Sequence, residues 1–313
     1  MTNMPVVGTD VPPGHAVIDV SHLPMRRVNA QQRFLTGFGG TAREVWNHRE
    51  LLSGLVRKEL KVKYKDSALG FMWSLLLPLF QLSVYWLVMG QFLNAGAIPA
   101  YGIFIFSGLA VWTLFNEIAT SSTASVVNNA GLVKKVYFPR ELFPLAAVGA
   151  ALVNFLFQLV ILLGAVVVAG LTTGAWPDPA KFPMPVLGLL VLVLFGTALG
   201  LLLAATNVYL RDVQHLIGIV LMLWFWVTPI IYDVGKVAAV LSPPLYTIYL
   251  LNPMAAVVFS FQKFFWPQGA DTQFDFDGDQ YLRLGVLAVV SAAFLWFAQR
   301  VFARVQGNFA QEL

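Results

Sequence analysis

Ionisable side chains that could do chemistry inside an apolar segment are nearly absent from this sequence, and Glu117 is the main exception. It lies sixteen residues into the apolar segment Tyr101–Val126 and is followed by the hydroxyl side chains of Thr120, Ser121, Ser122, Thr123 and Ser125. An acid within a membrane segment is a functional candidate by default. No second acid or buried base is expected in the other apolar segments. This argues against a proton relay and favours a role in helix packing or in lining a cavity.

The rest of the sequence holds no recognisable catalytic or metal-binding pattern. Because there is no cysteine, a thiolate nucleophile, a disulfide and a thiolate metal site are excluded. The four histidines are scattered, and no G-x-x-x-x-G-K-[ST] loop is present that could bind ATP. The Asp-rich stretch from Asp271 to Asp279 lacks the bidentate Glu of a calcium loop, which favours a solvated external loop. The chain is therefore predicted to be no enzyme and to hold no metal or cofactor of its own.

Composition identifies the class of protein that contains Glu117. The chain has 313 residues, of which 58% are hydrophobic and only 12% are charged, whereas soluble domains are about 25% charged. The predicted fold class is therefore an all-α integral membrane protein. In such a protein the net charge of +4 is no argument for nucleic-acid binding, and the distribution of the charge matters more than its total.

The stretch Trp46–Lys65 is predicted to form an amphipathic helix in the membrane interface, because an apolar stripe runs beside a basic face. The stripe holds Leu51, Leu52, Leu55, Val56 and Leu60, and the basic face holds Arg49, Arg57, Lys58, Lys61, Lys63 and Lys65. The uncharged segment Phe71–Leu93 follows and is long enough to cross a bilayer, which takes about 20 apolar residues. A soluble amphipathic helix on a globular core is the alternative, and the span that follows at once argues against it.

Six apolar segments are predicted to span the membrane. They are Phe71–Leu93, Tyr101–Val126, Glu141–Ala169, Met184–Tyr209, Gln214–Tyr232 and Tyr281–Ala303. Ten Lys and Arg residues precede the first segment, and none lies between the first and the second. Because cytosolic loops carry the excess of Lys and Arg, both termini are predicted to be cytosolic. The expected location is the plasma (inner) membrane, with multiple passes.

Three regions of different character follow from this pattern. Residues 1–42 are expected to be a cytosolic tail, residues 43–66 the interfacial helix, and residues 67–313 the six-helix transmembrane domain. Between the fifth and sixth spans, two apolar and aromatic stretches, Leu245–Leu251 and Met254–Trp266, are separated by Asn252 and Pro253. They predict two short helices that dip into the outer half of the membrane or lie on it.

The cytosolic loop Asn128–Arg140 places exposed aromatic residues beside charges, which suits a surface for docking another protein. Its candidate residues are Lys134, Lys135, Tyr137, Phe138 and Arg140. The alternative is that these cations merely flank a membrane span.

Aromatic residues are dense near the predicted outer ends of the spans, notably Trp224, Trp226, Tyr232, Tyr246 and Tyr249. They could form an interfacial belt. They could equally form a path along which sugar rings slide, because the C–H faces of sugars pack on aromatic faces. Periodicity does not separate these two hypotheses.

Taken in order, several stretches resemble the ABC-2-type polysaccharide export permeases, the Wzm-like transmembrane subunits, over about residues 44–313. They are Arg57-Lys-Glu-Leu-Lys-Val-Lys-Tyr-Lys-Asp-Ser-Ala-Leu-Gly-Phe-Met-Trp73, Lys134-Lys-Val-Tyr-Phe-Pro-Arg-Glu141, Asn207-Val-Tyr-Leu-Arg-Asp212, Thr228-Pro-Ile-Ile-Tyr232, Asn252-Pro253 and Phe309-Ala-Gln-Glu-Leu313. Glu59 stands where many members have Asp, which is a conservative difference. The long N-terminal tail is more similar to actinobacterial members, whose cargo would be cell-wall galactan.

The resemblance implies a homodimer that works with two separate ATPase subunits, on which ATP and Mg would bind. Its cargo would be a polysaccharide such as O-antigen, teichoic acid, capsule or galactan, linked to an undecaprenyl- or decaprenyl-type lipid. By position, Lys134–Arg140 would be the segment that couples to the ATPase. The interfacial helix would be a gate whose Arg57, Lys58 and Lys61 meet the pyrophosphate of the lipid carrier.

Other functions make different demands on the sequence. A drug or small-lipid exporter of the same superfamily would have a narrow pore in place of a wide aromatic one. A membrane glycosyltransferase would need a nucleotide-sugar domain or paired carboxylates, and neither is visible. An ion-coupled transporter would need buried ionisable pairs, and no internal repeat of the kind found in secondary transporters is visible.

Overall fold

The structure is a computed structural model that describes residues 43, 45–63, 65, 70–92, 98–135, 138–269 and 277–313. The predicted tail of residues 1–42, Tyr137 of the predicted docking loop, and Asp271 and Asp275 of the predicted acidic loop lie outside the described residues.

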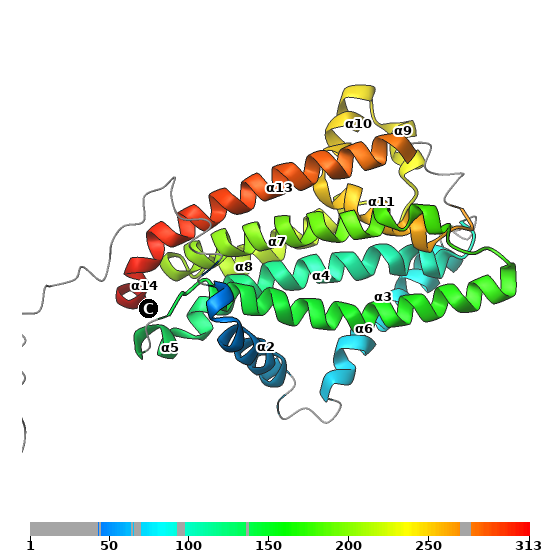
Figure 1. Cartoon of the computed structure of the whole chain (residues 1–313). Coiled ribbons are helices and arrows are strands. Elements are labelled where there is room, and N and C mark those ends of the chain that lie inside the picture. The colour runs from blue at the N-terminus through cyan, green and yellow to red at the C-terminus, as the bar shows by residue number, and fades with distance from the viewer. Residues whose placement is uncertain are drawn as a thin grey trace, which may run out of the picture. The chain divides into compact units, whose positions relative to one another are not determined.

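Every regular element in the described part of the chain is a helix, as the sequence predicts (Figure 1). The principal helices are α2 (Arg49–Lys63), α3 (Trp73–Tyr85), α4 (Tyr101–Asn128), α5 (Ala130–Lys135), α6 (Leu142–Thr173), α7 (Pro183–Tyr209), α8 (Val213–Val227), α9 (Val234–Val240), α10 (Pro243–Leu250), α11 (Pro253–Phe265), α13 (Asp277–Val305) and α14 (Phe309–Glu312). A π-helical segment, Trp86–Phe92, continues α3, and short 3-10 turns lie at Gly70–Met72, Pro179–Lys181 and Gln306–Asn308.

Four helical segments are long and apolar enough to cross a membrane: Tyr101–Asn128, Leu142–Thr173, Pro179–Tyr209 and Gln280–Glu312. The bent pair α10–α11 could count as a fifth. The predicted first and fifth spans correspond to shorter apolar helices, so the six-span topology stays a prediction for these two. Helix α13 begins at Asp277, a residue that the sequence analysis assigned to a loop.

The helix that corresponds to the predicted fifth span ends before the apolar sequence does. Helix α8 has 15 residues, which is about 22 Å at 1.5 Å per residue, against a hydrocarbon core of about 30 Å. The chain leaves the helix at Thr228, before Pro229, and Thr228 and Ile230 are both fully buried. Non-helical backbone is tolerated at membrane depth where protein surrounds it, and this segment meets that condition.

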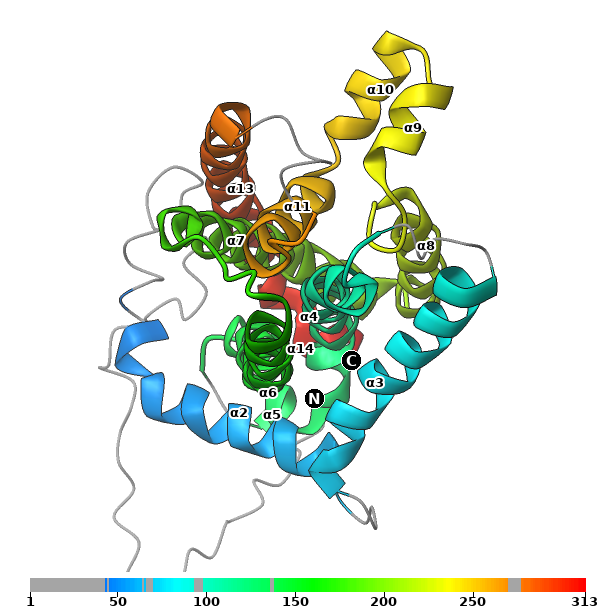
Figure 2. The ribbon, with the colours of Figure 1, turned by 90° about the vertical axis from the view of Figure 1, so that its right-hand side faces the viewer.

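Helix α4 is the centre of the bundle, with α6, α7, α8 and α11 around it (Figure 2). Glycines of α7 allow a close contact with α4: a Cβ placed on Gly200 would lie 2.7 Å from the Ser122 Cβ, and one on Gly196 would lie 3.1 Å from Ile118 Cγ2. Small residues at helix interfaces in membranes let backbones approach closely. A hydrogen bond of 3.0 Å from Asn207 Nδ2 to the Thr123 carbonyl joins the same two helices.

The two short helices predicted between the fifth and sixth spans are present as α10 and α11, which meet at an angle of 79°. The turn is fixed by Asn252, whose Oδ1 accepts from the Met254 amide at 3.0 Å and so caps α11. Most of α11 is buried against α4 and α7. That these helices dip into the outer half of the membrane stays a prediction.

The predicted amphipathic helix is present as α2, which runs across the view in Figure 2 while α4, α6 and α7 are seen end-on. Its Leu55 is buried, and Val56 packs against α6 so closely that a Cβ on Gly149 would lie 2.7 Å from Val56 Cγ2. Leu51, which the sequence analysis placed in the apolar stripe, is exposed. The stripe that packs on the bundle is therefore narrower than predicted.

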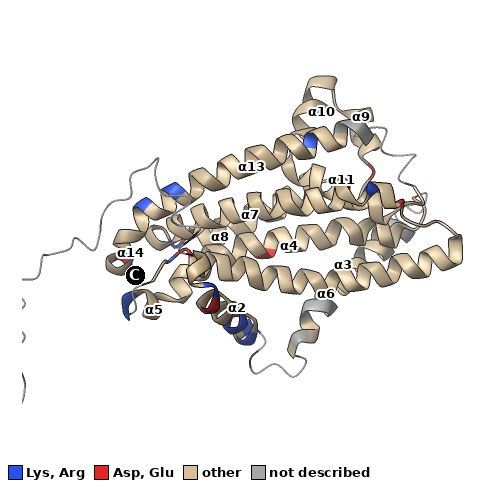
Figure 3. Cartoon of the chain, in the orientation of Figure 1, with Lys and Arg blue, Asp and Glu red and all other residues tan. Residues whose placement is uncertain are grey.

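Basic residues gather at one end of the bundle, over α2, α5 and the end of α13 (Figure 3). This is the distribution that the positive-inside rule associates with a cytosolic face. The cytosolic location of this end, and of both termini, stays a prediction.

Candidate functional site

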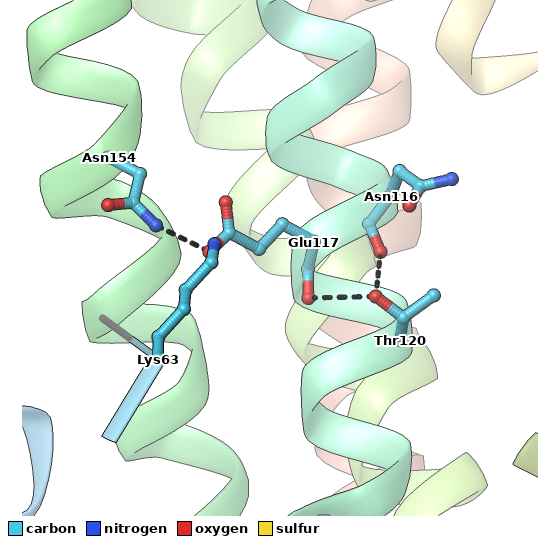
Figure 4. Close-up of polar contacts among 5 residues, drawn as sticks. All are labelled: Lys63, Asn116, Glu117, Thr120 and Asn154. Atoms are coloured by element: carbon cyan, nitrogen blue, oxygen red, sulfur yellow. Dashed lines mark hydrogen bonds and ion pairs between the residues drawn. The ribbon is translucent and has the colours of Figure 1, made fainter. Parts of the chain in front are cut away.

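Three helices converge on the side chain of Glu117, which extends from α4 (Figure 4). Lys63 Nζ at the end of α2 lies 2.6 Å from Glu117 Oε1, and Asn154 Nδ2 on α6 donates to the same oxygen at 2.5 Å. The exposed fraction of the side chain is 14% for Glu117 and 46% for Lys63. The acid is therefore held in an ion pair at the rim of the bundle and is not isolated in its interior.

Neither partner of Glu117 was identified from the sequence. Lys63 is 54 positions from Glu117 and Asn154 is 37 positions away, so no helical spacing connects them. The only available signal was physical: a carboxylate in an apolar segment needs a charged or hydrogen-bonding partner. Among the described residues, no group of three His, Cys, Asp or Glu side chains could hold a metal ion.

The basic residues predicted to form the lipid-carrier site, Arg57, Lys58 and Lys61, are all exposed on α2. Lys58 also donates to Asn129 Oδ1 just beyond the end of α4. Asn129 is nearly buried and returns a hydrogen bond of 2.7 Å from its Nδ2 to the Ser125 carbonyl. Lys58 therefore ties α2 to the bundle, while the side chains of Arg57 and Lys61 are exposed and make no hydrogen bond or ion pair with the described part of the chain.

The predicted docking residues divide into two groups. Lys134 and Lys135 are exposed in the last turn of α5. Phe138, predicted to be exposed, is instead partly buried, with its ring centroid 5.3 Å from that of Phe143. Arg140 turns to the C-terminal end, where it donates to the Gln306 carbonyl and lies 6.0 Å from the centroid of the Phe309 ring. The Phe138 ring is apolar, so its packing against Phe143 is more favourable than its exposure to water.

The aromatic residues of the predicted sugar path also fall into two groups. Tyr232, Tyr246 and Tyr249 lie together: the hydroxyls of Tyr232 and Tyr249 are 3.2 Å apart, and the rings of Tyr246 and Tyr249 stack with centroids 6.3 Å apart. The Tyr232 hydroxyl also donates to the Trp226 carbonyl at 2.9 Å, and the Trp226 side chain is 51% exposed.

The contacts of the Trp224 side chain differ from those within this tyrosine cluster. Its ring packs edge-on against Phe115 and Phe195, with centroids 5.3 Å and 6.2 Å away. Its indole nitrogen donates to Asn252 Oδ1 at 2.9 Å, and Asn252 Nδ2 donates to Thr228 Oγ1 at 3.0 Å. Within one chain, Trp224 therefore serves packing and fixes the turn before α11.

The expectation that no second acid or base is buried is wrong. Glu141, Lys263 and Arg300 are each at most 3% exposed. Gln299 Nε2 donates to Glu141 Oε1 at 3.1 Å, and within the described residues no hydrogen-bond partner contacts Nε or Nη2 of Arg300. These residues lie at the ends of predicted spans or in the short helices, where a hydropathy pattern does not separate a flanking charge from a buried one.

Comparison with known proteins gives the family. Residues 50–266 match the model of the ABC-2 type transporter family. The chain is 32% identical over 271 residues to an O-antigen export system permease protein RfbA of Myxococcus xanthus, covering 87% of this chain and 98% of the relative. An RfbA permease of Klebsiella pneumoniae is 27% identical over 265 residues, which are 84% of this chain and 95% of the relative.

A polysialic acid transport protein KpsM of Escherichia coli is more distant, with 22% identity over 210 residues that cover 66% of this chain and 78% of the relative. The family match contains all of α2 but its first residue, the Glu117 site, α5 and the tyrosine cluster, whereas α13 and α14 lie beyond its end. The chain therefore belongs to the ABC-2 type transporter family and resembles its polysaccharide export permeases.

Proposed function

We propose that this chain is the transmembrane subunit of an ATP-driven exporter that moves a lipid-linked polysaccharide across the plasma membrane. The observation that carries the proposal is the match to 98% of the length of a permease named for O-antigen export. Glycans of the O-antigen, teichoic acid, capsule or galactan type are all within the proposed substrate class.

The energy source is proposed to be a separate ATPase subunit, because the sequence holds no phosphate-binding loop. Its docking surface would be the exposed last turn of α5, with Lys134 and Lys135, at the end of the bundle where the basic residues gather. Arg140 and Phe309 support this turn from behind, since α14 contacts α5. Two copies of the chain and two ATPase subunits would form the complex.

The substrate's anionic carrier would be received by α2. This helix carries five basic and two acidic residues, and Arg57 and Lys61 are exposed. Each Lys or Arg near an anionic membrane surface contributes about 1 kcal/mol of attraction. Charge-assisted hydrogen bonds to a pyrophosphate would add to this.

The glycan would pass the aromatic residues at the other end. Trp226 and the tyrosine cluster of Tyr232, Tyr246 and Tyr249 offer rigid faces and hydroxyls in one place. Such faces lose little rotamer entropy on contact, so that a sugar can be bound weakly and released. In a homodimer, the two clusters would line a shared path.

The test is reconstitution of the chain with its ATPase in proteoliposomes that contain a labelled undecaprenyl-linked glycan. ATP should move the label to the opposite leaflet, where a membrane-impermeant glycosidase removes it. An ATPase whose phosphate-binding Lys is changed to Ala should abolish the movement. The same vesicles with a labelled short lipid that lacks glycan test the alternative: equal or faster transport of that lipid would identify a small-lipid exporter instead.

A further inference from the structure

The two side chains that donate to the Glu117 carboxylate have the composition of an anion-binding site. Its Oε1 accepts from Lys63 Nζ and Asn154 Nδ2 at 2.6 Å and 2.5 Å (Figure 4). Asn154 is 1% exposed, so one of the two donors is fixed within the bundle. A buried amide donor with an adjacent ammonium group suits any carboxylate or phosphate oxygen. Here the two donors bind an acid of the chain itself.

The two donors differ in how firmly they are held. Asn154 lies in the middle of α6, whereas Lys63 is the last residue of α2, and its side chain is 46% exposed. The pair with Glu117 is therefore open to solvent on the side of Lys63. A partly exposed ion pair contributes little net stability, since water competes for both partners, so a stronger anion can replace the carboxylate.

The same ion pair is one of the contacts that hold α2 on the bundle, beside the packing of Leu55 and Val56. Lys58 holds α2 at Asn129, just after α4, and Lys63 holds it at Glu117. These two anchor points on or beside α4 are twelve residues apart, which is about 18 Å along the helix axis. Loss of the second anchor would remove the ion pair that holds the C-terminal end of α2 on the bundle.

We propose that Lys63, Glu117 and Asn154 form a latch in which Glu117 is a tethered anion, and that the phosphate group of a lipid-linked substrate opens it by taking Lys63 from Glu117. This inference deepens the proposed function and rests on it for the identity of the substrate. Glu117 then acts as a positioning residue that both holds α2 and competes with the substrate for Lys63.

Competition gives the two members of the pair opposite effects on binding. Glu117→Gln removes the competing charge and should tighten the binding of undecaprenyl pyrophosphate by about fivefold or more, and Lys63→Gln should weaken it by about fivefold or more. If the pair had only a structural role, both substitutions would change the binding affinity in the same direction. Lys65→Gln is the matched control, since it removes the same charge two residues further on from an exposed side chain, and should change binding less than about twofold.

The experiment uses the full chain in phosphatidylcholine nanodiscs. Because the sequence has no cysteine, Val62→Cys on α2 and Leu156→Cys on α6, both 58% exposed, can carry spin labels for a distance measurement. Undecaprenyl pyrophosphate should lengthen the distance between the labels, and Glu117→Gln should lengthen it without ligand. A second arm uses inorganic pyrophosphate: an equal shift would show that the free anion suffices, and no shift would show that the lipid-linked form is required.

Two results would overturn the latch: Glu117→Gln and Lys63→Gln that change binding in the same direction, or a label distance that neither ligand nor Glu117→Gln alters. The experiments can reject the latch and the proposed function independently of each other. Opposite effects on binding without glycan transport would retain the latch and reject polysaccharide export. Glycan transport with same-direction effects would retain export and reject the latch.

Discussion

Lys63 at the end of the amphipathic helix and Glu117 within α4 are 54 positions apart in the sequence, yet their charged groups lie 2.6 Å from each other. The contact joins the most basic helix to an acid in one of the most buried helices. The Glu117 carboxylate is therefore not isolated, and it is part of the attachment between α2 and the bundle.

The first prediction concerns the energy of this pair. Lys63→Glu should destabilise the docked position of α2, because two carboxylates would then face each other, and Lys63→Glu with Glu117→Lys should restore most of the loss. The coupling energy should be about 1 kcal/mol, since Lys63 is partly exposed. A double-mutant cycle on the thermal unfolding of the purified protein measures it. A coupling energy of zero would mean that the two charges do not interact.

The second prediction concerns the ATPase surface. Lys134→Glu with Lys135→Glu should abolish copurification of the ATPase while the protein still accumulates in the membrane, because both side chains are exposed on α5. The control is Lys236→Glu on α9, an exposed Lys at the other end of the bundle. Stoichiometric ATPase in the double mutant would exclude this turn as the docking surface.

The third prediction concerns the support of that turn by the C-terminal helix. Phe309 is fully buried, lies under Arg140 and packs edge-on against Phe302 at 5.3 Å. Phe309→Ala should lower the free energy of unfolding by about 3 kcal/mol and reduce ATPase stimulation. Phe309→Leu should recover most of both, as it refills the volume. Unchanged unfolding of Phe309→Ala in a denaturant series would show that α14 does not pack on the bundle.

The fourth prediction separates the two kinds of aromatic residue. Trp226→Ala should slow glycan export with little effect on stability, because its side chain is half exposed. Trp224→Ala should lower stability by about 3 kcal/mol, because its ring packs on Phe115 and Phe195. Export per folded dimer and thermal unfolding are measured for both. If Trp226→Ala leaves export per dimer unchanged, Trp226 belongs to a membrane belt and not to the glycan path.

The fifth prediction concerns the close contact between α4 and α7. Gly200→Ala should destabilise the bundle by about 1–3 kcal/mol, because the new methyl would meet the Ser122 side chain 2.7 Å away. Gly164→Ala on α6 is the matched control, since nothing lies within 4 Å of its Cβ position. It should be neutral or stabilising by about 0.5–1 kcal/mol through helix propensity. Equal effects of the two variants would contradict the close approach of α4 and α7.

Much of the architecture could be predicted from the sequence. The all-helical class, the amphipathic helix, the long helices α4, α6, α7 and α13, and the two short helices either side of Asn252 all follow from local patterns. Hydrophobic periodicity, uncharged length and an Asn-Pro helix start each depend on residues within one or two turns. Such signals are local, so they identify elements and not the contacts between them.

The sequence alone determined the principal elements and the charges they carry, but not the short helices α5, α9 and α14. Only the tertiary structure decided which of these charges and rings meet. It joined Lys63 and Asn154 to Glu117, turned Arg140 toward Phe309, packed Trp224 against Phe115, and buried Arg300. The physical reason is that a carboxylate or a ring requires some partner to offset its removal from water, but many residues could satisfy that requirement. The choice among them is made by how closely whole helices pack, as Gly149 and Gly200 allow here, and no local pattern contains that information.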